Sequence, residues 1–95
     1  MKVSVRLFTT LRELAGKAIE TIEFSPNTVT LKDVLEELVK KNGKIFKDYL
    51  YNERGKVRDH LQLLVNGKSV SLLEELDTQL KEGDQVAIIP PVGGG

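Results

Sequence analysis

The side chains of this sequence offer little covalent chemistry of their own. It has no cysteine, so it has no thiol nucleophile and no disulfide, and its single histidine, His60, stands apart from any constellation of serine, cysteine or metal ligands. The most unusual stretch is the ending Pro90-Pro91-Val92-Gly93-Gly94-Gly95. Glycines at such an end have no side chains to pack. We therefore take this ending as the candidate functional segment.

The ending consists of two prolines that restrict the backbone and, after Val92, three glycines without side chains. Pro90 and Pro91 fix φ and favour an extended exit from the residues before them. Gly93, Gly94 and Gly95 lack a Cβ, so the walls of a binding site can close onto their backbone. From Pro91 to Gly95 the arm reaches roughly 15 Å at full extension. A frayed end or a cloning scar is the plain alternative, but a scar does not usually continue a predicted strand through Pro-Pro-Val.

The rest of the chain is predicted to form one small domain. Its 95 residues suffice for a single core. Lys+Arg and Asp+Glu both number 14, and this balance argues against a partner held by bulk electrostatics, such as a nucleic acid. No apolar run is long enough to span a membrane, and the start of the chain has no signal core. We expect a cytoplasmic protein without a nucleic-acid or membrane partner.

The first part of the domain is predicted to be a pair of strands. Lys2–Phe8 and Ile19–Phe24 alternate apolar and polar residues, which is typical of half-buried strands. Leu11–Gly16 between them reads as one helical turn closed by its glycine. Because the two strands lie close in sequence, we expect them to pair antiparallel.

A helix is predicted to start after Thr30. Thr30 and Asp33 have the spacing of a capping box, and Asn42-Gly43 ends the pattern. Five apolar residues share one helical face: Leu31, Val34, Leu35, Leu38 and Val39. We expect the first four of them, Leu31 to Leu38, to pack against apolar residues of the strands, namely Val3, Val5, Ile22, Val86 or Ile88.

The second half of the chain is predicted to return to strands. Lys44–Asp59 fits no clear element, whereas Leu61–Val65 reads as a strand and Asn66-Gly67 as the turn of a hairpin. Gln85–Ile89 is apolar on both faces, which is typical of a central strand. We therefore predict an α+β fold in which a mixed, mostly antiparallel sheet is crossed by one main helix. Residues 1–89 form the body and residues 90–95 the tail.

Three stretches resemble a known family. Phe8–Gly16 is similar to the "LRELAG" segment of the small subunit of molybdopterin synthase, and Val65-Asn66-Gly67 matches that family's hairpin. Gly83–Val92, followed by Gly94-Gly95, resembles its ending. The resemblance covers essentially the whole chain and implies the β-grasp, ubiquitin-like fold. The family usually has alanine or serine where this chain has Gly93, which leaves room for a relative that modifies proteins.

The resemblance implies a sulfur carrier, the non-catalytic subunit of a sulfurtransferase complex. A ubiquitin-activating-type enzyme would use ATP to adenylate the carboxylate of Gly95, and a sulfur donor would convert it to a thiocarboxylate. The tail, Pro90 to Gly94, would then insert into the large subunit of molybdopterin synthase. There the sulfur passes to a pyranopterin precursor in molybdenum cofactor biosynthesis. The resemblance implies no bound cofactor and no metal.

The tail alone is too short to bind strongly, so part of the body must also dock. We expect a docking patch on the sheet face away from the helix, near the exit of the last strand. Phe8 and Ile89 are its candidate apolar contacts.

Two other functions stay open at this point. One is a ubiquitin-like modifier joined through Gly95 to lysines of other proteins, and the other is a noncovalent β-grasp interaction module. A sulfur carrier for thiamine or tungsten-cofactor synthesis is a variant of the first hypothesis. The sequence leaves the sulfur acceptor and the oligomeric state open.

Overall fold

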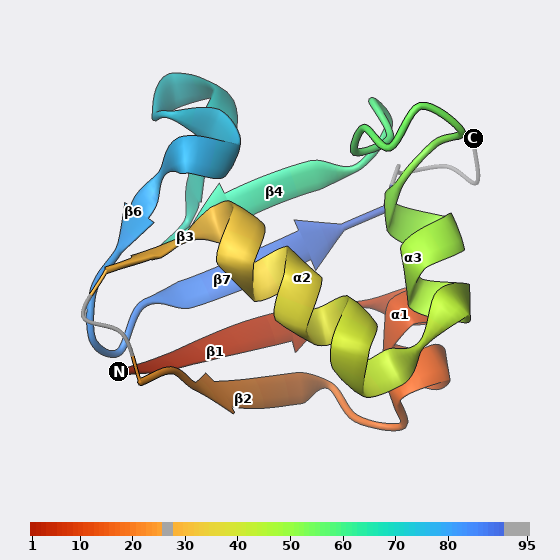
Figure 1. The fold of residues 1–95 in the computed structure, drawn as a ribbon, viewed down its shortest axis with the longest axis horizontal. Coiled ribbons are helices and arrows are strands. Elements are labelled where there is room, and N and C mark those ends of the chain that lie inside the picture. Colours follow the sequence, from red (N-terminus) through yellow and green to blue (C-terminus); the bar gives the residue numbers. More distant parts are fainter. Residues whose placement is uncertain (26–27, 91–95) are drawn as a thin grey trace.

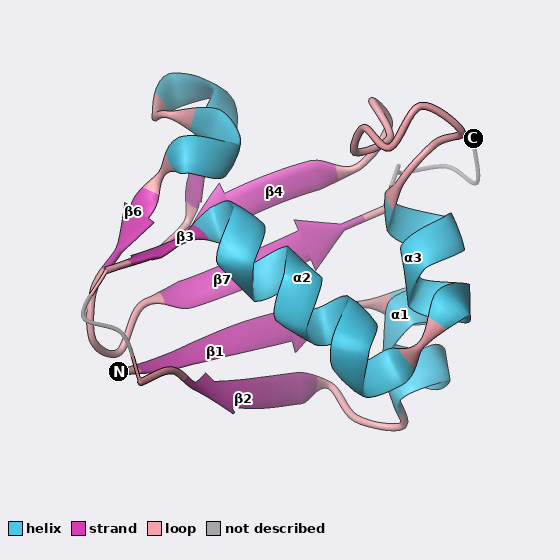
Figure 2. Ribbon diagram, in the orientation of Figure 1, coloured by secondary structure: helices cyan, strands magenta, loops and turns pink. Residues whose placement is uncertain are grey.

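The computed structural model describes residues 1–25 and 28–90 (Figures 1 and 2). The elements of the first half are β1 (Lys2–Leu7), α1 (Thr9–Ala15), β2 (Ile19–Glu23), β3 (Val29–Thr30), α2 (Leu31–Asn42) and α3 (Lys44–Leu50). Those of the second half are β4 (Gln62–Val65), β5 (Lys68–Ser69), the 3-10 turns η1 (Val70–Leu72) and η2 (Glu75–Asp77), β6 (Gln79–Leu80) and β7 (Gln85–Ile89). The predicted tail residues Pro91, Val92, Gly93, Gly94 and Gly95 lie outside the described residues.

A five-stranded sheet organises the fold, in the order β2-β1-β7-β4-β5. The pair β1–β7 is parallel and the other pairs are antiparallel. This confirms the predicted antiparallel pair of β1 and β2 and the central position of the last strand. β3 and β6 form a separate two-stranded sheet, which the sequence did not predict.

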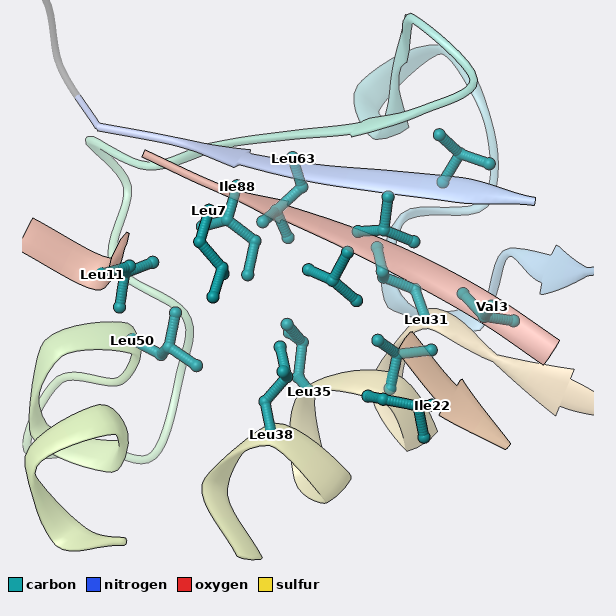
Figure 3. Close-up of a cluster of buried hydrophobic side chains, with 14 of the residues drawn as sticks. Val3, Leu7, Leu11, Ile22, Leu31, Leu35, Leu38, Leu50, Leu63 and Ile88 are labelled. Carbon is teal, nitrogen blue, oxygen red and sulfur yellow. The ribbon is translucent and has the colours of Figure 1, made fainter. Parts of the chain in front are cut away.

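The main helix, α2, lies across one face of the five-stranded sheet (Figure 2). Its capping box is formed: the backbone N–H of Thr30 donates to Asp33 Oδ2 over 2.9 Å, and the Asp33 N–H donates back to Thr30 Oγ1 over 3.4 Å. Leu31, Val34, Leu35 and Leu38 are buried in one cluster with the sheet residues predicted to meet them, Val3, Val5, Ile22, Val86 and Ile88 (Figure 3). The predicted core is confirmed.

The stretch after α2, which had no clear pattern, contains a third helix. Gly43 separates α2 from α3 with a φ of 85°, a conformation that favours glycine. Phe46 and Leu50, one turn apart on α3, are fully buried. α3 stands at one end of α2, close to α1 (Figure 1). It closes the end of the core that α2 leaves open.

The side chain of Asn52 fixes the turn that begins the loop between α3 and β4. The Asn52 carboxamide oxygen accepts the backbone N–H groups of Arg54 and Lys56, over 2.8 and 3.1 Å. A bridge between Tyr51 and Val57 closes the same turn. Among the described residues, no helix is long and apolar enough to cross a membrane.

Candidate functional site

The root of the tail is fixed in the middle of the sheet. β7 is paired with β1 on one side and with β4 on the other, and its last residue, Ile89, lies opposite Gln62. Asn66 ties the start of the same strand to the β4–β5 hairpin, because its Oδ1 accepts the Gln85 N–H over 2.9 Å. The chain therefore reaches Pro90, the last described residue, from a rigid strand.

One face of this sheet is left open by the helices. Along β7, Val86 and Ile88 are buried toward α2, so Gln85, Ala87 and Ile89 project to the opposite side. The same alternation and the strand register define what we call the open face. Its members are Lys2, Ser4, Arg6, Ile19, Thr21, Glu23, Gln62, Leu64, Ser69, Gln85, Ala87 and Ile89, with Phe8 at its end.

The two predicted docking residues lie together on the open face. The register of β1 and β7 ends with Leu7 opposite Ile88, so the next residues along each chain, Phe8 and Ile89, are neighbours. Both side chains are half-buried. The guanidinium of Arg6 lies 5.6 Å from the centre of the Phe8 ring, which places Phe8 on the Arg6 side of the sheet. The patch adjoins Pro90, and its role in docking stays a prediction.

Sequence reasoning missed one apolar member of this face, Leu64. Leu64 lies opposite Ala87 in the β4–β7 register. On the open face, this pair is next to the pair of Gln62 and Ile89. Leu64 stands in a continuous apolar run, Leu63-Leu64-Val65, so its side chain gave no sign of facing outward. Only the pairing of β4 with β7 assigns it to the open face.

A groove of about 520 Å³ lies on the other side of the molecule, between α2, α3 and η2. Glu36, Val39, Tyr51 and Leu76 are among its lining residues. Burial, and then the negative charge of Glu36, raise the pKa of the Tyr51 hydroxyl above its ordinary value. No residue of the open face lines this groove. Within residues 1–25 and 28–90, no cluster of three or more acidic or histidine side chains could hold a metal ion.

Two curated relatives are similar over almost their whole length. Small archaeal modifier protein 3 of Haloferax volcanii is 33% identical over 100 residues, covering all of both chains. The molybdopterin synthase sulfur carrier subunit of Drosophila sechellia is 34% identical over 95 residues, covering all of this chain and 92% of the relative.

Solved structures share the fold. Small archaeal modifier protein 1 of Haloferax volcanii superposes with a TM-score of 0.86 at 27% identity, over 100% of both chains. A chain of the BexX/CysO complex of Amycolatopsis orientalis gives 0.75 at 27% identity, over 98% of this chain and 99% of that one. The predicted β-grasp, ubiquitin-like fold is therefore confirmed. A profile of the ThiS family matches residues 5–95, and the chain belongs to this family of ubiquitin-like sulfur-carrier proteins.

Proposed function

We propose that this protein carries sulfur as a thiocarboxylate on Gly95 and delivers it in molybdopterin synthesis. The observation that carries the proposal is the position of the tail root. β7 is held between β1 and β4 and presents Pro90 beside the open face. A partner that covers this face receives the tail at a fixed point, and an arm of roughly 15 Å then reaches a buried reaction centre.

The carboxylate carbon of Gly95 is a poor electrophile, so the proposed chemistry begins by activating it. The carboxylate of Gly95 attacks the α-phosphate of ATP in a ubiquitin-activating-type enzyme, forming an acyl-adenylate and releasing pyrophosphate. A sulfide-level donor then attacks the acyl carbon and expels AMP, which leaves a thiocarboxylate. Where the donor is an enzyme persulfide, a thiol reductant cleaves the acyl disulfide formed first. The sulfur is carried on the backbone, so the absence of cysteine is compatible with this role.

The proposed acceptor is a pyranopterin precursor bound by the large subunit of molybdopterin synthase. The Drosophila relative named as a sulfur carrier subunit of that synthase supports this acceptor. The solved BexX/CysO complex, one chain of which shares this fold, supports a carrier that works bound to a partner protein. Phe8 and Ile89, joined by Leu64 and Ala87, are the proposed apolar contacts of the body.

A second function, protein modification through Gly95, is favoured by a different observation. The Haloferax relative named a modifier is similar over its whole length, and Gly93 departs from the usual synthase ending. Both functions begin with the same adenylate. They diverge afterward, because the acyl carbon is transferred to a lysine amine instead of receiving sulfur.

Mass spectrometry of the protein isolated from its own cells separates these functions. We expect a species whose mass corresponds to replacement of one oxygen by sulfur at Gly95. Conjugates with Gly95 linked to lysines of other proteins, without the sulfur species, would favour the modifier. A free carboxylate alone, under conditions of active cofactor synthesis, would favour the noncovalent interaction module.

A further inference from the structure

A charged side chain lies at the centre of the open face. Arg6 on β1 is exposed, and its cross-strand neighbours are Ile19 on β2 and Ala87 on β7. Leu64 follows Ala87 in the same row of the sheet. Ser69 of β5 ends the row. Three of its five residues are therefore apolar, Ser69 is small and polar, and Arg6 carries a full positive charge.

Within residues 1–25 and 28–90, no carboxylate is paired with this charge. Among the described residues, no acidic oxygen lies within 4.0 Å of the Arg6 guanidinium, since both ion pairs there involve Glu20. The acidic residue of β2 on the open face, Glu23, lies opposite Lys2 at the far end of β1. The guanidinium of Arg6 instead lies over the ring of Phe8. A phenyl ring accepts no conventional hydrogen bond, so this contact leaves the N–H donors of the guanidinium available to a partner.

This arrangement restricts which partner surface fits. A partner that covers the open face must remove the guanidinium from water, and a buried charge without a partner is costly. A carboxylate compensates best, because its two oxygens match two parallel N–H donors of an arginine. An entirely apolar partner surface would bear the cost of desolvating Arg6 and would form no compensating hydrogen bond with it.

We propose that Arg6 is a specificity-determining residue that binds a carboxylate at the centre of the adenylating enzyme's docking surface. The inference rests on the proposed function, in which this enzyme covers the open face. The adenylating enzyme is the partner because the carrier and modifier functions both require it. The Phe8 ring lies against the guanidinium, so this residue links the charged contact to the apolar patch.

The test is ATP–pyrophosphate exchange by the adenylating enzyme encoded in the same genome, with the carrier concentration varied. Arg6→Leu should raise the KM for the carrier roughly tenfold or more and leave kcat nearly unchanged, because it strands the enzyme's carboxylate. Arg6→Lys, which keeps the charge and loses the planar fork, should fall between wild type and Arg6→Leu. Lys2→Leu, on the same strand and face but at its far end, is the matched control and should behave as wild type.

The outcomes separate two hypotheses: the role of Arg6, and docking through the open face as a whole. An unchanged or lower KM for Arg6→Leu would mean that the enzyme places no carboxylate there, and would overturn the role of Arg6. Ile89→Asp should also raise the KM; if it does and Arg6→Leu does not, the docking face stands and only the role of Arg6 falls. If neither changes the KM, docking through the open face is wrong as well. Thermal unfolding of each variant checks that it is folded.

Discussion

Among single residues, Tyr51 reports on how the segment after α2 is packed. Its side chain is half-buried at the end of α3, in the groove that Glu36 of α2 also lines. Burial and the charge of Glu36 both favour the protonated phenol, so the pKa of Tyr51 is raised in the folded state. The folded protein therefore holds this proton more tightly than the unfolded chain. The resulting stabilisation is complete below the ordinary pKa and is lost as pH rises through the folded-state pKa.

The free energy of unfolding of the wild-type protein should fall as pH rises above about 10, the ordinary tyrosine pKa. We predict that this fall is smaller in the Tyr51→Phe variant, because position 51 then has no phenol to titrate. Urea titrations at a series of pH values would measure it. Tyrosinate absorbance should show that Glu36→Gln moves the Tyr51 titration to lower pH, because it removes one of the two causes. A titration unmoved by Glu36→Gln would mean that α3 and its end are not packed against α2 as described.

Among the elements, α2 supplies the largest share of the helix side of the core. Leu35, at the middle of its buried face, has no exposed surface. We predict that Leu35→Ala lowers the free energy of unfolding by about 2–5 kcal/mol, from lost burial and the cavity that remains. Urea denaturation would measure it. Glu36→Ala, at the next, exposed position of the same helix, is the control and should change stability little.

The edge strand β2 carries a buried charge toward the helix. Glu20 is 5% exposed, and its Oε2 lies 3.2 Å from Lys17 Nζ and 3.8 Å from Lys41 Nζ at the end of α2. Glu20→Lys would gather three positive charges in one place. Both lysines are about half exposed, so we predict a moderate loss of about 1–2 kcal/mol in the free energy of unfolding.

Glu23→Lys is the matched control for that substitution, because Glu23 is exposed on the opposite face of the same strand. Its effect on the urea midpoint should be small. An equal loss in both variants would mean that the effect comes from net charge or strand propensity and not from the contacts of Glu20.

The elements that the sequence predicted are those whose signal is local. α2 has a capping box and a full helical period, and β1, β2 and β7 show their burial pattern in consecutive residues. α3 spans only seven residues and shows two buried positions one turn apart, so its burial depends on contacts with the rest of the core. β3 and β6 have two residues each, too few for any period.

The candidate site was predictable to the same extent. Alternation along β7 placed Ile89 on the face away from α2, and Phe8 followed from the alternation of β1. The grouping of Arg6, Leu64 and Ala87 was not predictable, because these residues come from strands far apart in the chain. It depends on the parallel pairing of β1 with β7, which no local pattern in either strand specifies.

At the scale of the whole molecule, the residues that stabilise the fold are separate from the proposed reacting group. The buried cluster runs from Val3 to Ile88, and the proposed reacting group lies seven residues beyond it, at Gly95. The body positions the root of the tail, and its open face is the surface that we propose docks a partner. Changes at the tip should therefore alter reactivity without altering the stability of the body.

We predict that adding one residue after Gly95, or deleting Gly95, abolishes thiocarboxylation and leaves thermal unfolding unchanged. Either change moves the terminal carboxylate by roughly 3.5 Å relative to the body. A misplacement of about 1 Å can already cost a hundredfold in rate. An added side chain would also clash if, as proposed, the walls of the partner's site close onto glycine backbone. Incubation with the adenylating enzyme, ATP and a sulfur donor, followed by mass spectrometry, measures the outcome.

Ile89→Asp provides the complementary variant, since it keeps the tail and changes the open face beside its root. It should weaken docking yet still allow thiocarboxylation at high carrier concentration, whereas the tail variants should not recover at any concentration. This contrast separates a fault in binding from a fault in the position of the reacting carbon. If a chain extended past Gly95 becomes thiocarboxylated without prior trimming, the carrier mechanism is contradicted. If such a chain also supported cofactor synthesis normally, the noncovalent interaction module would be the better account.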